Sequence, residues 1–523
     1  MKENKTFTKN RGIMIALVVA IIIAATSTFL LIFPQEEGII TSAENQIYAG
    51  SPAKYVFFFI GDGLGQPQRT AAEEFHASKF GMKSGSKAMN MTNFPVQGVT
   101  TTHANNRFIT GSAAAATALA CGHKTNIDYI GVDPELKPLR TIAEMAKERG
   151  MKVGIISSVS IDHATPACFY AHQPNRSMYH EIEHDLVNSK FDYFAGGGFK
   201  DPTGKKSKKP LGDVFSKAKE NGYTIVSDNK DFMMLTPASG KVIAYNSNLP
   251  DGKALPYHID NANCDISLAD FTRKGIELLD NPKGFFMMVE GGKIDWACHA
   301  NDAVSAIIDT FAFDDAIEEA LNFYSRHPND TIIVVTGDHE CGGLTLGFAG
   351  TKYETSFDVL KNQSISFQKF TDEFMAEYKQ THAGNADLDD IFPNIEKYFG
   401  LTTVGNGPLA LADYEVEELR KAFEQSMSGM EVKSPVDYLL YGGYDPLTVK
   451  ITHILNRKAG LAWTSYSHTG VPVITSAKGV GENIFSGYYD NTDIARKLMS
   501  VMGIKSQVAD TIQTKKINIA MAQ

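Results

Sequence analysis

Short apolar runs bounded by polar or glycine-rich segments recur along the chain and predict strands that are buried on both faces. The clearest runs are residues 55–60, 151–157, 285–289 and 331–335, with a further candidate within 191–199. Segments between them have helical character, most clearly 113–120, 140–149, 211–221 and 310–325. Strands that alternate with helices indicate an α/β fold, with a large and mostly parallel central sheet and helices on both faces.

The segment from about 345 to 440 differs from its surroundings, because it carries more charge and fewer strong apolar runs. We interpret it as an accessory insertion within a catalytic domain that spans 54–503, with one predicted helix over 413–423. After it, Asp445-Pro446 is typical of a helix start, where an N-cap residue precedes a proline. Residues 504–523 are expected to form a polar tail.

The N-terminus combines four basic residues within its first eleven positions with an uncharged, mainly apolar run over 13–33. This run is long enough to span a bilayer. We favour an uncleaved membrane anchor, because no small-residue cleavage site follows it directly, and a removed signal sequence is the alternative. Residues 1–34 would then be the anchor or signal and 35–53 a linker. The basic N-terminal flank predicts that the catalytic domain faces the periplasm or the exterior, or is secreted if cleavage occurs.

The composition excludes some classes of function. A net charge of −10 argues against nucleic-acid binding, which needs a basic surface. An anionic substrate must therefore be attracted by local cationic groups rather than by the field of the whole protein. Five cysteines are few for an exported chain of 523 residues, and no CxxC pattern occurs. We do not expect a fold that depends on disulfides.

Polar residues follow directly on three of the predicted strands. Asp62 follows the first, Glu290 the third, and Asp338-His339 the fourth. In parallel sheets, ligand sites lie beyond the carboxyl ends of the strands, so we expect these side chains to converge. Each alone has an ordinary explanation, such as the Asp-Gly turn at Asp62.

A second set of polar residues lies on predicted helices and loops. Asp295 and His299 stand four residues apart and share one face of a helical turn, and a carboxylate with an imidazole suits zinc. Ser112 begins the alanine-rich helix, where free amides favour an anion, although a serine there is also a common N-cap. Arg176 has a guanidinium that can hold two phosphate oxygens, or it is a solvated surface residue.

Seven motifs between residues 60 and 470 resemble those of the alkaline phosphatase family and occur in the family's order. They are IGDGLGQ (60–66), TGSAAAATALACGHKT (110–125), DHATPA (162–167), AHQPNR (171–176), VEGGKIDWACHA (289–300), VVTGDHECGG (334–343) and GLAWTSYSHTG (460–470). The resemblance implies the same α/β fold, in which the segment at about 345–440 would be a crown-like subdomain.

The resemblance also implies two zinc ions and one magnesium ion. The first zinc would be bound by Asp295, His299 and His468. The second zinc would be bound by Asp62, Asp338 and His339. The magnesium would be bound by Asp62, Thr165 and Glu290.

The activity implied by the resemblance is hydrolysis of small-molecule phosphate monoesters to an alcohol and inorganic phosphate. Ser112 would attack phosphorus and form a phosphoserine, because a neighbouring zinc lowers the pKa of its hydroxyl. Arg176 would hold the phosphate oxygens. Dimerisation is common in the family, so a homodimer is also implied as an option.

Three positions depart from the family pattern. Gly111 stands where the family usually has an aspartate that helps to hold the arginine, so weaker phosphate binding and a more mobile Arg176 are expected. His163 and Trp296 replace an aspartate and a lysine of the best-known bacterial branch, so the identity and occupancy of the third metal site stay open. Two alternative functions remain: a phosphodiesterase of the same superfamily, and a non-catalytic surface protein that holds metal.

Overall fold

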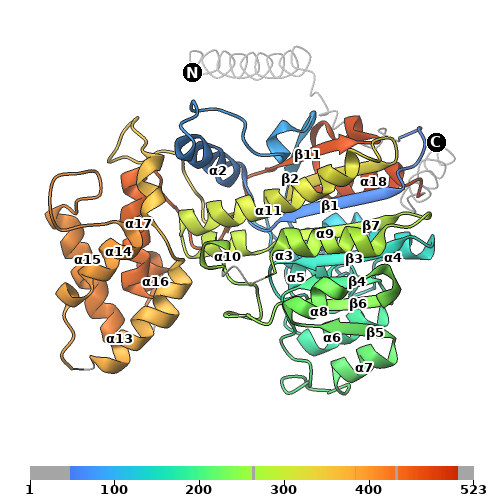
Figure 1. Cartoon of the computed structure of the whole chain (residues 1–523), viewed down its shortest axis with the longest axis horizontal. Coiled ribbons are helices and arrows are strands. Elements are labelled where there is room, and N and C mark those ends of the chain that lie inside the picture. The colour runs from blue at the N-terminus through green and yellow to red at the C-terminus, as the bar shows by residue number, and fades with distance from the viewer. Residues whose placement is uncertain (1–47, 262–265, 383, 430–433, 505–523) are drawn as a thin grey trace, which may run out of the picture. The chain divides into compact units, whose positions relative to one another are not determined.

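The computed structural model describes residues 48–261, 266–382, 384–429 and 434–504. Its central element is one ten-stranded sheet (Figure 1). The strand order is β12-β2-β11-β8-β1-β7-β3-β4-β6-β5. Neighbouring strands are parallel except where β11 pairs with β2 and β8. The strands are β1 (Tyr55–Gly61), β2 (Val96–Thr101), β3 (Lys152–Ser157), β4 (Tyr193–Gly196), β5 (Tyr223–Val226), β6 (Lys241–Tyr245), β7 (Phe285–Gly291), β8 (Thr331–Gly337), β11 (Val473–Gly479) and β12 (Gly487–Asp490).

Helices cover both faces of this sheet, as the sequence predicts. Phe59 of β1 packs on Phe313 of α11, with ring centroids 5.9 Å apart. Phe58 points to the other face and packs on Phe169, which follows α5, at 6.1 Å. The helices are α2 (Gln66–Lys79), α3 (Ser112–Cys121), α4 (Ile142–Glu148), α5 (Ala164–Ala167), α6 (Tyr179–Asn188), α7 (Val214–Glu220), α8 (Asn229–Met234), α9 (Leu268–Leu279), α10 (Lys293–His299), α11 (Ala303–Tyr324), α17 (Pro446–Ala459) and α18 (Asn491–Val501).

The register of the central strands aligns their carboxyl ends. Gly61 of β1 lies opposite Gly291 of β7 and Gly337 of β8. All residues of these three strands are buried, as expected for apolar runs covered on both sides. The polar residues that follow the strands therefore emerge at one edge of the sheet.

The predicted strands and helices are found, with shifted ends. The helix predicted over 310–325 begins earlier, at Ala303, because the Asp302 side chain accepts a hydrogen bond from the Ser305 amide and caps it. α17 begins at Pro446 after Asp445, whose side chain accepts from the Thr448 amide, as the Asp-Pro pair predicts. β2, β5, β6, β11 and β12 are strands that no predicted apolar run covers.

The accessory segment is built from short helices in the part of 345–440 that the structure describes. They are the 3₁₀ helices η5 (Phe357–Asn362) and η7 (Leu388–Asp390), the π-helical turn η6 (Phe370–Met375), and α12 (Phe367–Lys369), α13 (Ala376–Thr381), α14 (Phe392–Phe399), α15 (Asp413–Met427) and α16 (Pro435–Tyr441). α15 contains the helix predicted over 413–423. α14, α15 and η5 pack against α17, and η5 also contacts α2. The domain boundaries at 345 and 440 stay predictions.

The predicted membrane segment at 13–33 lies outside the described residues, as does the whole tail after 504. Within the described ranges, each helix is too short or too polar to cross a bilayer. Four of the cysteines lie in these ranges, and all four are free and buried.

Because both faces of β1 are buried, substitutions on either face should lower the free energy of unfolding by similar amounts. Phe57→Ala and Phe58→Ala should each lower the free energy of unfolding by about 3–5 kcal/mol, because each leaves a cavity in a core. Urea unfolding would measure the loss, with Phe80→Ala, at an exposed aromatic residue, as a control that changes little. A loss below about 1 kcal/mol for either core variant would contradict burial on that face.

Candidate functional site

A cluster of two carboxylates and one imidazole forms where β1 and β8 end. The Nε2 atom of His339 lies 3.3 Å from Asp62 Oδ1 and 3.3 Å from Asp338 Oδ2, and all three side chains are buried. The Asp338 carboxylate also accepts a hydrogen bond from the Gly63 amide at 3.1 Å. Gly63 has a positive φ of 71°, and an added Cβ would come within 2.8 Å of the Asp295 backbone, so this turn requires glycine.

A second cluster joins α10 to a small two-stranded antiparallel sheet. His299 Nε2 lies 3.3 Å from Asp295 Oδ2, one helical turn away, as their spacing predicts. His468 comes from β10 (His468–Thr469), which pairs with β9 (Glu340–Cys341), and its Nε2 lies 3.1 Å from that of His299. Both imidazoles donate from Nδ1 to backbone carbonyls, of Tyr466 and Thr110 respectively. This arrangement leaves each Nε2 as the atom available to a ligand.

A third cluster forms between β3 and β7. Asp62, His163 and Glu290 bring one potential ligand atom each within 4.8 Å of the others. Ser157 donates a short hydrogen bond to Glu290 Oε2. Thr165 of α5 is fully buried, and its hydroxyl has no hydrogen-bond partner among the described residues. Burial raises the pKa of Glu290 to about 7, although the hydrogen bond from Ser157 opposes that rise. Asp62 thus belongs to two clusters.

Ser112 is the first residue of α3, and Gly111 takes the N-cap position without a side-chain bond. The alternative role of Ser112 as a helix cap is therefore wrong. Its Oγ lies 3.4 Å from Nε2 of His339, which places the hydroxyl beside the first cluster. Arg176 donates from its guanidinium to Nε2 of His163 at 2.9 Å. Burial, and then the charge of Arg176, lower the pKa of His163 well below its usual value, so this imidazole is a neutral acceptor.

The electrostatics of the clusters fit divalent cations. Burial, followed by the charge of Asp338, raises the pKa of Asp62 well above its usual value, and burial does the same for Asp338. Burial lowers the pKa of His339, which keeps a nitrogen lone pair free. Both oxygens of Asp62 and Oδ2 of Asp338 are buried without a hydrogen bond in the described part of the chain. Such acids ionise together only beside a positive charge, and carboxylates with neutral imidazoles are the donor set of zinc.

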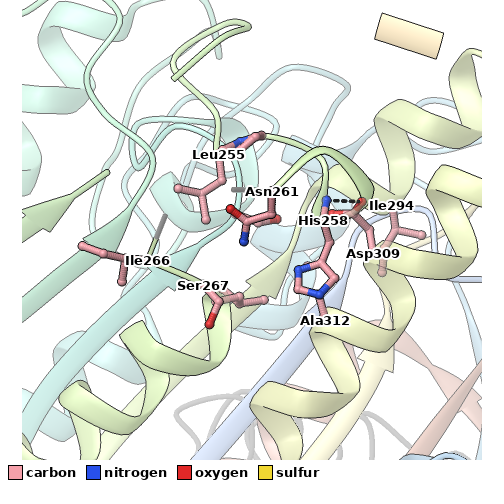
Figure 2. Close-up of a pocket in the computed structure, with 12 residues that line it drawn as sticks. Leu255, His258, Asn261, Ile266, Ser267, Ile294, Asp309 and Ala312 are labelled. Atoms are coloured by element: carbon pink, nitrogen blue, oxygen red, sulfur yellow. Dashed lines mark hydrogen bonds between the residues drawn. The ribbon is translucent and has the colours of Figure 1, made fainter. Parts of the chain in front are cut away.

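The clusters open into a cavity of about 640 Å³. Ser112, His163, Arg176, Asp295, His299 and His468 all line it. A second cavity, of about 20 Å³, lies between η4 (His258–Asp260), α9, α10 and α11 and is drawn in Figure 2, where the His258 amide donates to Asp309. It has room for about one water molecule. Only the larger of these two can admit a substrate.

The structure brings all ten predicted site residues to this one edge of the sheet, although their roles stay predictions. Seven of them form the three clusters, Thr165 lies beside Glu290, and Ser112 and Arg176 lie next to the clusters. His163, which the sequence marks only as a departure from the family pattern, contributes to the third cluster. Cys341, directly opposite His468 in the two-stranded sheet, lies with the second cluster and has no predicted role. Both residues follow the end of a strand, and this position is the sequence signal that could have identified them as cluster residues.

Comparison with known proteins identifies the relatives of this chain. The family model described as alkaline phosphatase matches residues 53–504. Alkaline phosphatase 3 of Bacillus subtilis is 31% identical over 468 residues, which cover 87% of this chain and 90% of that protein. The solved cold-active alkaline phosphatase of Shewanella sp. shares 30% identity with a TM-score of 0.70, covering 86% of this chain and 99% of that one. The Thermus thermophilus alkaline phosphatase, at 23% identity and a TM-score of 0.72 over 90% and 96% of the chains, shares the fold.

A site of this kind should stabilise the protein when it binds metal. Removing divalent cations with a chelator should lower the midpoint of thermal unfolding, and Zn²⁺ should restore it, because a ligand at a hundredfold excess over its Kd contributes about 2.7 kcal/mol. Asp338→Asn should reduce both the shift and the number of ions bound, measured by calorimetry and atomic absorption. Asp358→Asn, at an exposed carboxylate outside the clusters, is the matched control. Equal ion content in Asp338→Asn and wild type would contradict the assignment.

Proposed function

The chain belongs to the alkaline phosphatase family, and on this premise we propose that it hydrolyses phosphate monoesters to an alcohol and inorganic phosphate. The observation that carries the proposal is the buried Ser112 hydroxyl, 3.4 Å from His339, in a cavity that Arg176 also lines. A potential nucleophile, two ligand clusters and a cation that suits phosphate therefore share one space.

The three clusters suit three metal ions. We assign Asp295, His299 and His468 to one zinc, and Asp62, Asp338 and His339 to a second. Asp62, Thr165 and Glu290 are assigned to magnesium, and His163 is left out of this set because the lone pair on its Nε2 accepts from Arg176. When bound, such ions lower the pKa of a serine hydroxyl and neutralise charge on phosphate oxygens.

Ser112 is the residue that makes and breaks covalent bonds in this proposal. Its Oγ loses a proton and attacks phosphorus, the bond from phosphorus to the ester oxygen breaks, and the alcohol leaves after taking up a proton. Water then attacks the phosphoserine, which releases inorganic phosphate and restores the hydroxyl. The free amides at the start of α3 favour the negative charge that develops beside Ser112.

Arg176 holds the phosphate in this scheme. Its guanidinium can donate two parallel hydrogen bonds to phosphate oxygens, which orients phosphorus for attack and balances charge in the transition state. His163 accepts from the same guanidinium at 2.9 Å, so it takes the place of a carboxylate as the group that positions Arg176. A neutral partner holds an arginine less firmly than a charged one.

We also propose that the chain is exported and held at the membrane by residues 13–33, since this apolar run follows a basic N-terminus. The catalytic domain would then meet phosphate esters outside the cytoplasm. A homodimer remains a proposal from the family alone.

The nucleophile can be tested with an aryl phosphate. Ser112→Ala should lower kcat about a thousandfold or more, because the substitution removes the group that forms the covalent intermediate. Ser84→Ala, at an exposed serine, should leave the rate unchanged, and a chelator should stop the wild-type enzyme. A diaryl phosphate measured in parallel should be hydrolysed more slowly than the monoester. A Ser112→Ala rate equal to that of wild type would overturn the mechanism.

Gly111 offers a test of how Arg176 is held. An added Cβ would meet only Ile127 at 3.7 Å, and the backbone φ of −119° suits any residue, so an aspartate fits. Gly111→Asp should lower the inhibition constant for inorganic phosphate about fivefold, since a carboxylate would hold the guanidinium in place. Gly111→Asn, of equal size without charge, should have a smaller effect. An unchanged inhibition constant in Gly111→Asp would contradict the expectation.

A further inference from the structure

The cavity extends well beyond the residues that would hold a phosphate. We use the term outer wall for five residues that line it: Asp251, Tyr257, Phe367, Asp372 and Tyr444. They come from the loop after β6, from α12 and η6, and from the loop before α17. A substrate with its phosphate at Ser112 would place its alcohol portion against this wall.

Aromatic rings form one side of the outer wall. The ring of Phe367 lies 5.5 Å from that of Tyr257 and 5.6 Å from that of Tyr444, with both pairs edge to face. Tyr257 is only 1% exposed, and its hydroxyl makes no hydrogen bond in the described part of the chain. A buried hydroxyl that lines a cavity without a partner indicates that a polar ligand belongs there. Aromatic faces in such an arrangement attract cations.

Carboxylates form the other side. Asp251 and Asp372 are exposed, and neither forms an ion pair with a described residue. Both line the same cavity, and the pKa of Asp372 is raised by partial burial and by the charge of Asp251, whereas a hydrogen bond with Gln368 and the charge of Lys293 oppose the rise. A cation between the two carboxylates would relieve the repulsion of their charges.

The lysines near the outer wall do not line the cavity. Lys379 pairs with Asp445 at 2.7 Å. Lys293 has no exposed surface, and its Nζ lies 3.7 Å from the centre of the Tyr257 ring. Burial lowers the pKa of Lys293 to about 8, and the charges of Asp309, Asp251 and Asp372 oppose that shift, so Lys293 balances part of the negative charge of the outer wall from behind the Tyr257 ring. Among the described residues that line the cavity, Arg176 is the one lysine or arginine, and it lies at the phosphate end.

The backbone that carries Asp372 is unusual. Residues Phe370–Met375 form a π-helical turn between α12 and α13, and Thr371 and Asp372 of this turn both line the cavity. Single π-helical turns within helices cost stability and occur frequently at functional sites, because they redirect side chains. The turn here directs a carboxylate to the outer wall.

We propose that the outer wall binds a positively charged alcohol portion, so that the preferred substrates are phosphate monoesters of amino alcohols with a protonated or quaternary ammonium group. This inference rests on the proposed function and specifies its substrate class. Asp251 and Asp372 supply the opposite charge, and Phe367 and Tyr444 supply aromatic faces. The esters of neutral alcohols lack the group that these residues recognise.

Two esters of equal shape test the inference in the full-length, metal-loaded enzyme. Phosphocholine and 3,3-dimethylbutyl phosphate differ only in the charge of their terminal group, so the ratio of their kcat/KM values reports recognition of charge. Asp251→Asn and Asp372→Asn should each lower this ratio about two- to fivefold, as expected for exposed ion pairs. High salt should lower the ratio in wild type and have little effect in the double variant.

Glu373→Gln is the matched control, because it removes the same charge from the neighbouring exposed position, which does not line the cavity. It should leave the ratio unchanged. A ratio that is equal in wild type and both aspartate variants, or that falls as much in Glu373→Gln, would overturn the inference while turnover of an aryl phosphate still supported the proposed function. Absence of turnover for every ester would overturn both.

Discussion

The site depends on the burial of several carboxylates within reach of one another. Asp62, Glu290 and Asp338 lie at the edge of a sheet of apolar strands and have almost no exposed surface. Water cannot screen their charges there, so each makes ionisation of the others less favourable unless cations are present. The strands β1, β7 and β8 keep the three acids together because their side chains are packed on both faces. The same packed strands therefore form a stiff core and hold mutually repelling carboxylates together at its edge.

The parts of the fold that could be predicted are those with one dominant physical signal. β1, β3, β7 and β8 are continuous apolar runs, because a parallel strand in the middle of a sheet is covered on both sides. β11 gave no such signal, since its sequence VITSAKG mixes small and polar residues and its last residues are only partly buried. Its antiparallel direction depends on pairing with β2 and β8, which are distant in sequence.

The same distinction applies to the site. Asp62, Glu290 and Asp338 could be anticipated because each follows a recognisable strand, and Asp295 and His299 because their spacing fits one helical turn. The outer wall could not be anticipated. Asp251, Phe367 and Tyr444 lie in irregular or short elements without periodicity, and only tertiary packing brings them to one cavity.

The two ends of the cavity therefore have separate structural origins. Ser112 of α3, Asp295 and His299 of α10 and His468 of β10 line the inner end, whereas loops and the short helices around the π-helical turn supply the outer wall. Substitutions or insertions in the outer wall leave the register of β1, β7 and β8 untouched. Substitutions in the outer wall can therefore change which alcohol portions the cavity accepts without moving the residues assigned to phosphate and metal. Substrate specificity can then evolve independently of the catalytic residues.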